Sequence, residues 1–312
     1  MGERHARVFR SQPHAQLVAI YDVDPERAAA VAALYGAQAM KSEQAFLAAV
    51  DAVSVATPTP QHFANVEACL AAGKPVLVEK AITDRVAHAE RLTEQANRSG
   101  LLLMVGHIER YNPVFTELKR LIAASGEPPI ALSFRRLSSF ATSSQVVDVV
   151  LDLMIHDLDL MIDLCAGQEL AHHHGVGRIV RTREIDHAVA SVAFSSGPVA
   201  SLFASRVTEL KVREIEVTLP SVFLKADLLR KEILCYRNSR AAYWAANGGV
   251  LSQQRTHIEQ VQIPAAEPLA LEIADFVNSV RTGKPPQVTA QQATKSLRLA
   301  FALRDQMLHK ID

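Results

Sequence analysis

Apolar positions follow two different rhythms over the first hundred residues of the chain. The short, continuous apolar runs that predict buried strands are residues 17–21, 53–56, 76–78 and 101–105. The longer mixed segments that predict helices are residues 25–35, 57–72 and 84–98. Pro25 lies in a predicted first helical turn, and Gly73 and Gly100 follow predicted last turns. Buried strands that alternate with helices are typical of a parallel sheet covered on both faces.

After Gly106 the rhythm changes. The predicted helices of this part are residues 113–124, 151–165, 268–281 and 290–309. The predicted strands are residues 188–194, 199–204, 213–219, 222–226 and 256–263. Neighbouring strands with little helix between them indicate a mostly antiparallel sheet. We therefore expect an α/β chain with a parallel-sheet domain at residues 1–106 and an α+β domain with an open sheet at residues 107–312.

The composition excludes several classes of protein. The 33 basic residues balance the 33 acidic ones, so nothing argues for a nucleic-acid or membrane-surface partner. The longest apolar runs are too short to span a membrane, and the first residues show no charged and apolar pattern that would support a secretory signal. Three scattered cysteines (Cys69, Cys165 and Cys235) fit neither a disulfide framework nor a zinc motif. A cytoplasmic location is expected.

The first residues match the end of a dinucleotide-binding motif. In G-x-G-x-x-G, the last glycine opens a helix, and an acidic residue about twenty positions later binds the ribose hydroxyls. Gly2 and Asp22 have this separation, and the segment after Gly2 predicts a helix. We expect the first strand of the sheet and the two earlier glycines to lie upstream of Met1. The alternative is a non-catalytic relative that binds no cofactor.

Two polar segments follow predicted parallel strands. Glu79 and Lys80 end one strand, and Thr57, Pro58 and His62 follow another. Ligands of open α/β sheets bind beyond the carboxyl ends of the strands, so these residues are candidates for cofactor binding. Lys80 could also hold a hydroxyl or accept its proton. A solvated Glu-Lys pair is an equally good interpretation of the sequence alone.

An acidic stripe with one histidine marks the predicted helix 151–165. Asp152 and His156 are four residues apart, which places both on one helical face, and Asp159 and Asp163 extend the stripe. Histidine is well suited to proton transfer near neutral pH, and a neighbouring carboxylate can orient it. The alternative is an ordinary ion pair on a solvated face, but the apolar residues around the stripe favour a functional site.

Other polar residues give weaker signals. Arg110, Tyr111 and Asn112 follow the last predicted parallel strand and could bind an anionic or polyhydroxy substrate. Arg206 is a further candidate, although a charge at a sheet edge is as good an interpretation. The three adjacent histidines 172–174 cannot all point one way, so we expect a surface loop there and no metal site. His5 is expected to serve packing or to lie on the surface.

Taken together, these segments resemble the Gfo/Idh/MocA family of nicotinamide-dependent sugar and cyclitol oxidoreductases, over nearly the whole chain. The motifs that carry the resemblance are the Met1-Gly2-Glu3-Arg4-His5 start, Ala56-Thr57-Pro58-Thr59-Pro60, Glu79-Lys80-Ala81 in place of Glu-Lys-Pro, Asp152 with His156, and Thr282-Gly283-Lys284-Pro285-Pro286. The segment 106–113 and the surroundings of His156 are most similar to members that oxidise C3 of UDP-N-acetylglucosamine. Another sugar or a cyclitol such as myo-inositol is the alternative substrate.

The resemblance implies a Rossmann domain and a second domain whose open sheet packs against another subunit in a homodimer or homotetramer. It also implies that Lys80 and His156 flank the reacting carbinol, that one of them, in the first place His156, takes the hydroxyl proton, and that Asp152 binds substrate or orients the site. Val23, which follows Asp22, is not basic, and this favours NAD over NADP because nothing obvious would neutralise a 2′-phosphate.

Overall fold

The computed structural model describes residues 1–140, 147–246 and 249–309. The chain divides into two compact units, and each is built from two segments. Unit 1 contains Met1–Tyr111 and Ala266–Arg298, and unit 2 contains Asn112–Ala265 and Leu299–Asp312. The predicted boundary at residue 106 lies close to the end of the first segment. The sequence analysis did not anticipate that residues 266–298 return to unit 1.

Unit 1 contains five short parallel strands in two separate sheets. Strands β1 (Ala19–Ile20) and β2 (Gln38–Ala39) form one, and β3 (Val53–Val55), β4 (Val76–Glu79) and β5 (Leu103–Gly106) form the other in the order β3-β4-β5. The interior of β4 is fully buried at Val76, Leu77 and Val78. This agrees with the continuous apolar runs, which are typical of strands covered on both faces. The strand expected upstream of Met1 stays a prediction.

Helices alternate with these strands, as predicted. Those of the first segment are α1 (Gly2–Ser11), α2 (Pro25–Tyr35), α3 (Glu43–Ala49), η1 (Thr59–Gln61), α4 (His62–Ala71), α5 (Val86–Ser99) and η2 (Ile108–Tyr111). Asp24 begins α2 by accepting hydrogen bonds from the backbone N–H groups of Glu26 and Arg27. Gly36 ends the same helix with a φ of 72°, a left-handed conformation that glycine adopts without strain.

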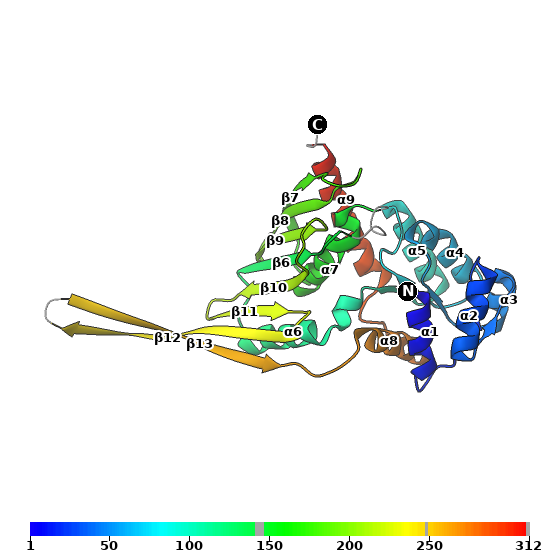
Figure 1. Ribbon diagram of the computed structural model, residues 1–312, viewed down its shortest axis with the longest axis horizontal. Helices are drawn as coiled ribbons and strands as arrows, with labels where there is room; N and C mark the ends of the chain where they lie inside the picture. The colour runs from blue at the N-terminus through cyan, green and yellow to red at the C-terminus, as the bar shows by residue number, and fades with distance from the viewer. Residues whose placement is uncertain (141–146, 247–248, 310–312) are drawn as a thin grey trace. The chain divides into compact units, whose positions relative to one another are not determined.

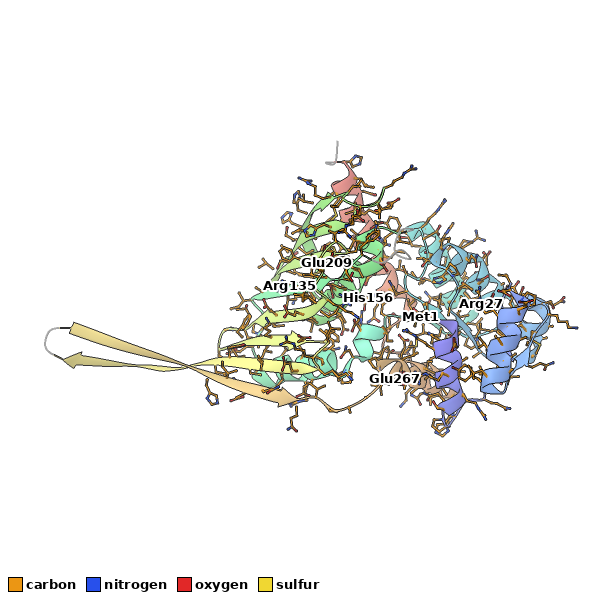
Figure 2. All side chains as sticks on the ribbon, viewed as in Figure 1. Met1, Arg27, Arg135, His156, Glu209 and Glu267 are labelled. Carbon is orange, nitrogen blue, oxygen red and sulfur yellow. The ribbon has the colours of Figure 1, made fainter. Side chains whose placement is uncertain are left out.

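The second segment of unit 1 comprises α8 (Pro268–Thr282) and the first half of α9 (Ala290–Leu308). Helix α8 packs against α1 and η2. Glu267, directly before α8 and labelled in Figure 2, forms an ion pair with Arg7 of α1. Ile273, Phe276 and Leu297 are buried. The core of unit 1 therefore depends on residues from both ends of the chain.

Unit 2 is built on one eight-stranded sheet with the order β13-β12-β11-β10-β6-β9-β8-β7 (Figure 1). Its strands are β6 (Ala131–Leu137), β7 (Leu170–Arg178), β8 (His187–Phe194), β9 (Val199–Ser205), β10 (Val212–Thr218), β11 (Val222–Asp227), β12 (Glu232–Ala246) and β13 (Gly249–Gln262). All neighbouring pairs are antiparallel except β6 and β9, which are parallel. This confirms the predicted α/β fold with a parallel sheet and a mostly antiparallel one.

Helices contribute to the core of unit 2. They are α6 (Pro113–Ser125), the single π-helical turn η4 (Val150–Met154), α7 (Ile155–Leu164) and the second half of α9. Phe115 of α6, Phe134 of β6, Met154 of η4 and Leu303 of α9 are fully buried in one hydrophobic cluster. The sheet thus buries one set of alternating side chains against these helices.

The last two strands extend beyond the rest of the sheet as a ribbon (Figure 1). Strand β11 pairs with β12 only from Glu232 to Arg237, whereas β12 and β13 continue to pair with each other as far as Ala246 and Gly249. An isolated two-stranded ribbon is at best marginally stable in water. The sequence analysis predicted no strand within the range of β12.

The histidine-rich segment corrects one expectation. Residues 172–174 are not a loop but belong to β7, where they pair with β8. His172 and His174 are exposed, whereas His173 between them is half-buried, because successive side chains of a strand point to opposite faces.

Among the described residues, none of the helices is both long and apolar enough to cross a bilayer.

Candidate functional site

The carboxyl ends of β3, β4 and β5 gather most of the predicted cofactor-binding residues of unit 1. Thr57 and Pro58 follow β3, Glu79 is the last residue of β4, and Lys80 comes directly after it. Because the three strands are parallel, their carboxyl ends lie at one edge of the sheet. This edge is where open α/β sheets bind their ligands. Lys80 is half-buried, and the peptide bond between Lys80 and Ala81 is cis.

His62 joins two of the loops at this edge. Its Nδ1 lies 2.8 Å from the backbone oxygen of Ala81, and its Nε2 lies 2.8 Å from that of Thr57. The side chain is buried at the start of α4. A buried histidine that bridges the loop after β3 and the loop after β4 fixes their spacing. The sequence predicts a cofactor contact for His62, and this stays a prediction beside the bridging role.

Glu79 lies in a chain of polar contacts that the sequence did not reveal. One carboxylate oxygen, Oε1, lies 2.9 Å from Nε2 of His5, and Nδ1 of His5 lies 2.8 Å from Oγ of Ser54. The other oxygen, Oε2, accepts a hydrogen bond from the backbone N–H of Lys80 at 3.3 Å. His5 is thus a buried partner of the predicted site, although the sequence favours packing or surface exposure. It lies on the buried face of α1 with Ala6 and Val8.

Two carboxyl groups near this chain have opposite pKa shifts. Burial alone would raise the pKa of Glu79, but the hydrogen bond from His5 and the charge of Lys80 hold it below its usual range. Burial and the charges of Glu79 and Asp275 raise the pKa of Glu272 on α8 well above its usual range. Glu79 is therefore ionised near neutral pH, whereas the environment of Glu272 favours its protonated form.

Asp22 fits the acidic position of a dinucleotide site. It follows β1, and its Oδ1 accepts a hydrogen bond from the backbone N–H of Asp24, which orients the carboxylate. Oδ2 lies 3.6 Å from an exposed guanidinium nitrogen of Arg27. Acceptor oxygens in this place suit the ribose hydroxyls of NAD. A side chain at Gly2 would have no described atom within 4 Å of its Cβ, so the space beside this glycine is open. A cofactor contact at Gly2 stays a prediction.

The predicted substrate residues at the end of unit 1 also have structural partners. Arg110 is buried, and its backbone oxygen accepts a hydrogen bond from the side chain of Gln287. The hydroxyl of Tyr111 donates to Asp275 at 2.7 Å, and burial together with this hydrogen bond raises the pKa of Tyr111. Asn112, the first residue of unit 2, begins α6 by accepting a hydrogen bond from the backbone N–H of Val114. Substrate contacts by these residues stay predictions.

Unit 2 carries Asp152 and His156 where a π-helical turn runs into α7, and Figure 2 labels His156. Asp152 belongs to η4, and His156 is the second residue of α7; both side chains are half-buried. Asp148 stabilises the start of the turn by accepting hydrogen bonds from the backbone N–H groups of Val150 and Leu151. The predicted helix is confirmed, and its π turn is of a kind often found at functional sites.

The neighbouring acids of α7 bind cations of other elements. Asp157 accepts two hydrogen bonds from Arg136 of β6, at 2.9 and 2.7 Å, and both side chains are buried. Asp163 forms an ion pair with Lys119 of α6 at 2.7 Å. These pairs tie α7, which carries His156, to the sheet and to α6, and only Asp163 of the two acids belongs to the predicted stripe.

Arg206 occupies a fully enclosed ion pair. Its Nε donates to Asp186 at 2.7 Å, and its other nitrogens donate to Val147 and Thr182. Burial alone would raise the pKa of Asp186, but the backbone N–H groups of Thr182, Arg181 and Val180, together with Arg206, lower it far below its usual range. These contacts account for the buried guanidinium in structural terms, and its predicted contact with substrate stays a prediction.

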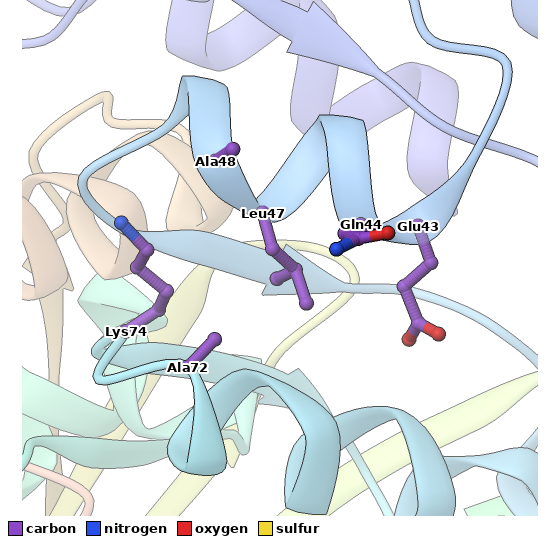
Figure 3. A pocket seen from close by; sticks show the side chains of 6 residues that line it. All are labelled: Glu43, Gln44, Leu47, Ala48, Ala72 and Lys74. Atoms are coloured by element: carbon purple, nitrogen blue, oxygen red, sulfur yellow. The ribbon is translucent and has the colours of Figure 1, made fainter.

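Other kinds of site find little support in the described part of the chain. No group of three or more His, Cys, Asp or Glu side chains there could hold a metal ion. The three cysteines are unpaired, and burial raises the pKa of Cys69 and Cys165 to about 12, which leaves little nucleophilic thiolate. A shallow hollow between α3 and the end of α4 contains none of the predicted site residues (Figure 3).

Known proteins resemble this chain over its full length. It is 35% identical over 307 residues to UDP-N-acetylglucosamine 3-dehydrogenase of Acidithiobacillus ferrooxidans, covering 97% of this chain and 95% of the relative. It is 27% identical to scyllo-inositol 2-dehydrogenase (NAD(+)) of Bacillus subtilis, with 97% and 90% covered. A crystal form of the Acidithiobacillus enzyme superposes with a TM-score of 0.88 at 32% identity, covering 100% of this chain and 95% of that one.

A model of the oxidoreductase family with an NAD-binding Rossmann fold matches residues 1–107. This is the part of the chain that holds Asp22, Glu79 and Lys80. Together with the full-length relative, the match confirms the resemblance inferred from the motifs. The chain belongs to the Gfo/Idh/MocA family of oxidoreductases, whose Rossmann domain binds NAD.

Proposed function

We propose that the protein oxidises the C3 hydroxyl of UDP-N-acetylglucosamine with NAD. The observation that carries this proposal is the 35% identity, over nearly all of both chains, to an enzyme named for that reaction. Two inositol dehydrogenases that match over nearly the full length are only 27% and 25% identical. The similarity extends across unit 2, which holds Asp152 and His156, so it does not rest on the common Rossmann fold alone.

The proposed chemistry is a hydride and proton removal from one carbinol. Bound NAD supplies the hydride acceptor. His156 accepts the proton of the hydroxyl, and the Lys80 ammonium holds its oxygen as charge develops. Asp152 orients the site or binds a substrate hydroxyl. The products are the 3-keto sugar nucleotide, NADH and a proton.

The first test is the formation of NADH from NAD and UDP-N-acetylglucosamine, followed by absorbance. We expect turnover of the sugar nucleotide and little with free myo-inositol. His156→Asn should lower kcat roughly 10²- to 10⁴-fold, the usual contribution of a general base, with a smaller change in KM. Glu94→Gln on the exposed face of α5 is the control. Turnover of myo-inositol but not of the sugar nucleotide would replace this substrate with a cyclitol.

We further propose that the outer face of the large sheet joins two or four copies of the chain. Val199 and Phe203 of β9 and Ile258 of β13 expose apolar side chains, and Phe223 and Tyr236 lie against each other on neighbouring strands. Large exposed apolar patches on the surface of a protein often mark protein–protein interfaces. Sedimentation of the intact protein tests this, and a monomer at micromolar concentration would contradict it.

The three unpaired cysteines suit the reducing cytoplasm, where we place the enzyme.

A further inference from the structure

Glu272 has no place in the chemistry described so far. Its side chain is fully buried on α8, and neither carboxyl oxygen has a hydrogen-bond partner among the residues that the structure describes. Buried polar groups are nearly always hydrogen-bonded, because leaving one unsatisfied is costly. A carboxyl group in such a place needs an explanation, and an ionised one would be costlier still.

The charged surroundings of Glu272 are mostly acidic. Glu79 of β4 and Asp275 of α8 both act on it, and both favour its protonated form. Glu272 in turn acts on Tyr111 of η2, as does the neighbouring Arg110. Among the described residues, the two groups that shift the pKa of Glu272 are therefore both acidic.

Glu79 is held from two sides. His5 of α1 lies 2.9 Å from one of its oxygens, and Ser54 of β3 holds the other nitrogen of His5 at 2.8 Å. The second oxygen of Glu79 accepts the backbone N–H of Lys80. Since a carboxylate is only an acceptor, Nε2 of His5 is the donor, and the tautomer follows from this partner. Three elements of unit 1 therefore fix the residue next to Lys80.

We propose that His5 and Glu79 are positioning residues for Lys80, and that Glu272 stays protonated beside them so that a single negative charge stands next to the lysine. The role of Lys80 rests on the proposed function. Ionisation of Glu272 would place a second buried carboxylate near Glu79 and disturb the group that holds the lysine backbone. The network thereby sets an upper pH limit on the geometry at Lys80.

The protonation of Glu272 can be tested without an activity assay, through the pH dependence of stability. A carboxyl whose pKa is raised by folding binds more protons in the folded state, so stability falls as pH rises from the unfolded pKa towards the folded one. Glu272→Gln keeps the shape of the side chain and removes this loss. We expect the Tm of the variant to exceed that of the wild type by a margin that grows by at least roughly 2–4 °C between pH 5 and 8. Glu94→Gln, an exposed control, should track the wild type.

The positioning role is tested by kinetics. His5→Leu removes the donor to Glu79, and we expect kcat to fall about tenfold or more with little change in KM. His5→Gln keeps an N–H donor near Nε2 and should recover most of the loss. In Glu272→Gln, the alkaline limb of the kcat profile should move to higher pH. A purely structural network would lower the amount of folded enzyme but leave the pH profile in place.

The outcomes separate this inference from the proposed function. If Lys80→Met keeps full activity, the role of the lysine fails, while the stability of Glu272→Gln still reports on the buried acid. If Glu272→Gln follows the wild type in stability at every pH, Glu272 is not a proton-holding group and the inference is overturned. Equal activity of His5→Leu and His5→Gln, at any level, would overturn the positioning role of His5.

Discussion

Buried ion pairs in unit 2 matter more for the stability of the fold than exposed ion pairs on the same sheet. Arg206 and Asp186 are enclosed, and the carboxylate accepts three backbone N–H groups besides the guanidinium. Arg135, labelled in Figure 2, forms an ion pair with Glu214 on the exposed side of β6. Breaking one partner of a buried pair leaves an uncompensated charge, whereas water and salt screen a surface pair.

We therefore expect Arg206→Met to lower the free energy of unfolding by about 3–5 kcal/mol. Arg135→Met, the matched control on the sheet surface, should cost about 0–1 kcal/mol. Chemical denaturation of both variants at neutral pH measures the difference. If Arg206→Met instead raises KM and leaves stability intact, the arginine binds substrate as the sequence suggested.

The same pair gives a pH dependence with a defined sign. The pKa of Asp186 is depressed on folding, so its contribution is complete above the unfolded pKa of about 3.9 and is lost as pH falls below it. We expect Asp186→Asn to flatten the fall in Tm between pH 5 and 3. A wild type and variant that lose stability in parallel over this range would contradict the assignment.

Sequence reasoning nominates site residues that belong to local motifs, and it does not reveal the contacts that join residues through the fold. Lys80, Asp152 and His156 are recognisable because each lies in a short pattern of neighbours. The contacts of His5 join it to Ser54 and Glu79, which are 49 and 74 residues away, and no local spacing encodes such a contact. The pairing of Arg206 with Asp186, which is 20 residues away, is not visible in the sequence for the same reason.

At the scale of elements, the patterns predicted helices with clear ends and strands with continuous apolar runs. Helix α2 is framed by Asp24 and Gly36, and β4 is apolar from Val76 to Val78. Strand β6 escaped because it contains Arg135 and Arg136, and the second of these points into the buried pair with Asp157. Strand β7 escaped because its histidines and glycines favour a loop when neighbouring strands are ignored.

Strand β7 contains glycines because α9 approaches its backbone closely. A Cβ at Gly175 would lie 2.7 Å from Cε of Met307 and 3.1 Å from the backbone oxygen of Leu303. The space at this position is therefore filled by the helix. Strand β7 can lie against α9 only because this side chain is missing.

We expect Gly175→Ala to destabilise unit 2 by about 1–3 kcal/mol through overpacking. In a Met307→Ala background the cost of the same substitution should shrink, since the closest atoms are gone. Val176→Thr, on the exposed face of the same strand, should change stability by less than about 0.5 kcal/mol. An equal cost of Gly175→Ala in both backgrounds would show that the contact with Met307 does not limit the packing.

At the scale of the molecule, α9 belongs to both units. Its first half, through Arg298, lies in unit 1, and its second half, from Leu299, lies in unit 2. Ala293 and Leu297 are buried in the first part, and Leu303 and Met307 in the second. The last helix therefore supplies core side chains to both parts of the chain.

A chain that ends at Arg298 should consequently lose stability in one unit only. It keeps both segments of unit 1 but lacks Leu303 and Met307, each of which contributes about 2–5 kcal/mol if truncation to alanine is the guide. Hydrogen exchange should show protection lost in residues 112–265 and kept in residues 1–111. A chain that ends at His309 is the control. Equal loss of protection in both ranges would mean that the units fold only together.

The interleaving of the two units has a consequence for synthesis on the ribosome. Many multidomain proteins fold from the N-terminus as each domain emerges. Here neither unit can be completed in that order, because the second segment of unit 1 follows the whole of residues 112–265, and unit 2 waits for the end of α9. We expect nascent chains stalled before residue 266 to remain sensitive to protease throughout, and resistant early fragments would argue otherwise. A nonsense mutation near the end of the gene would then still leave unit 2 without the core side chains that the end of α9 supplies.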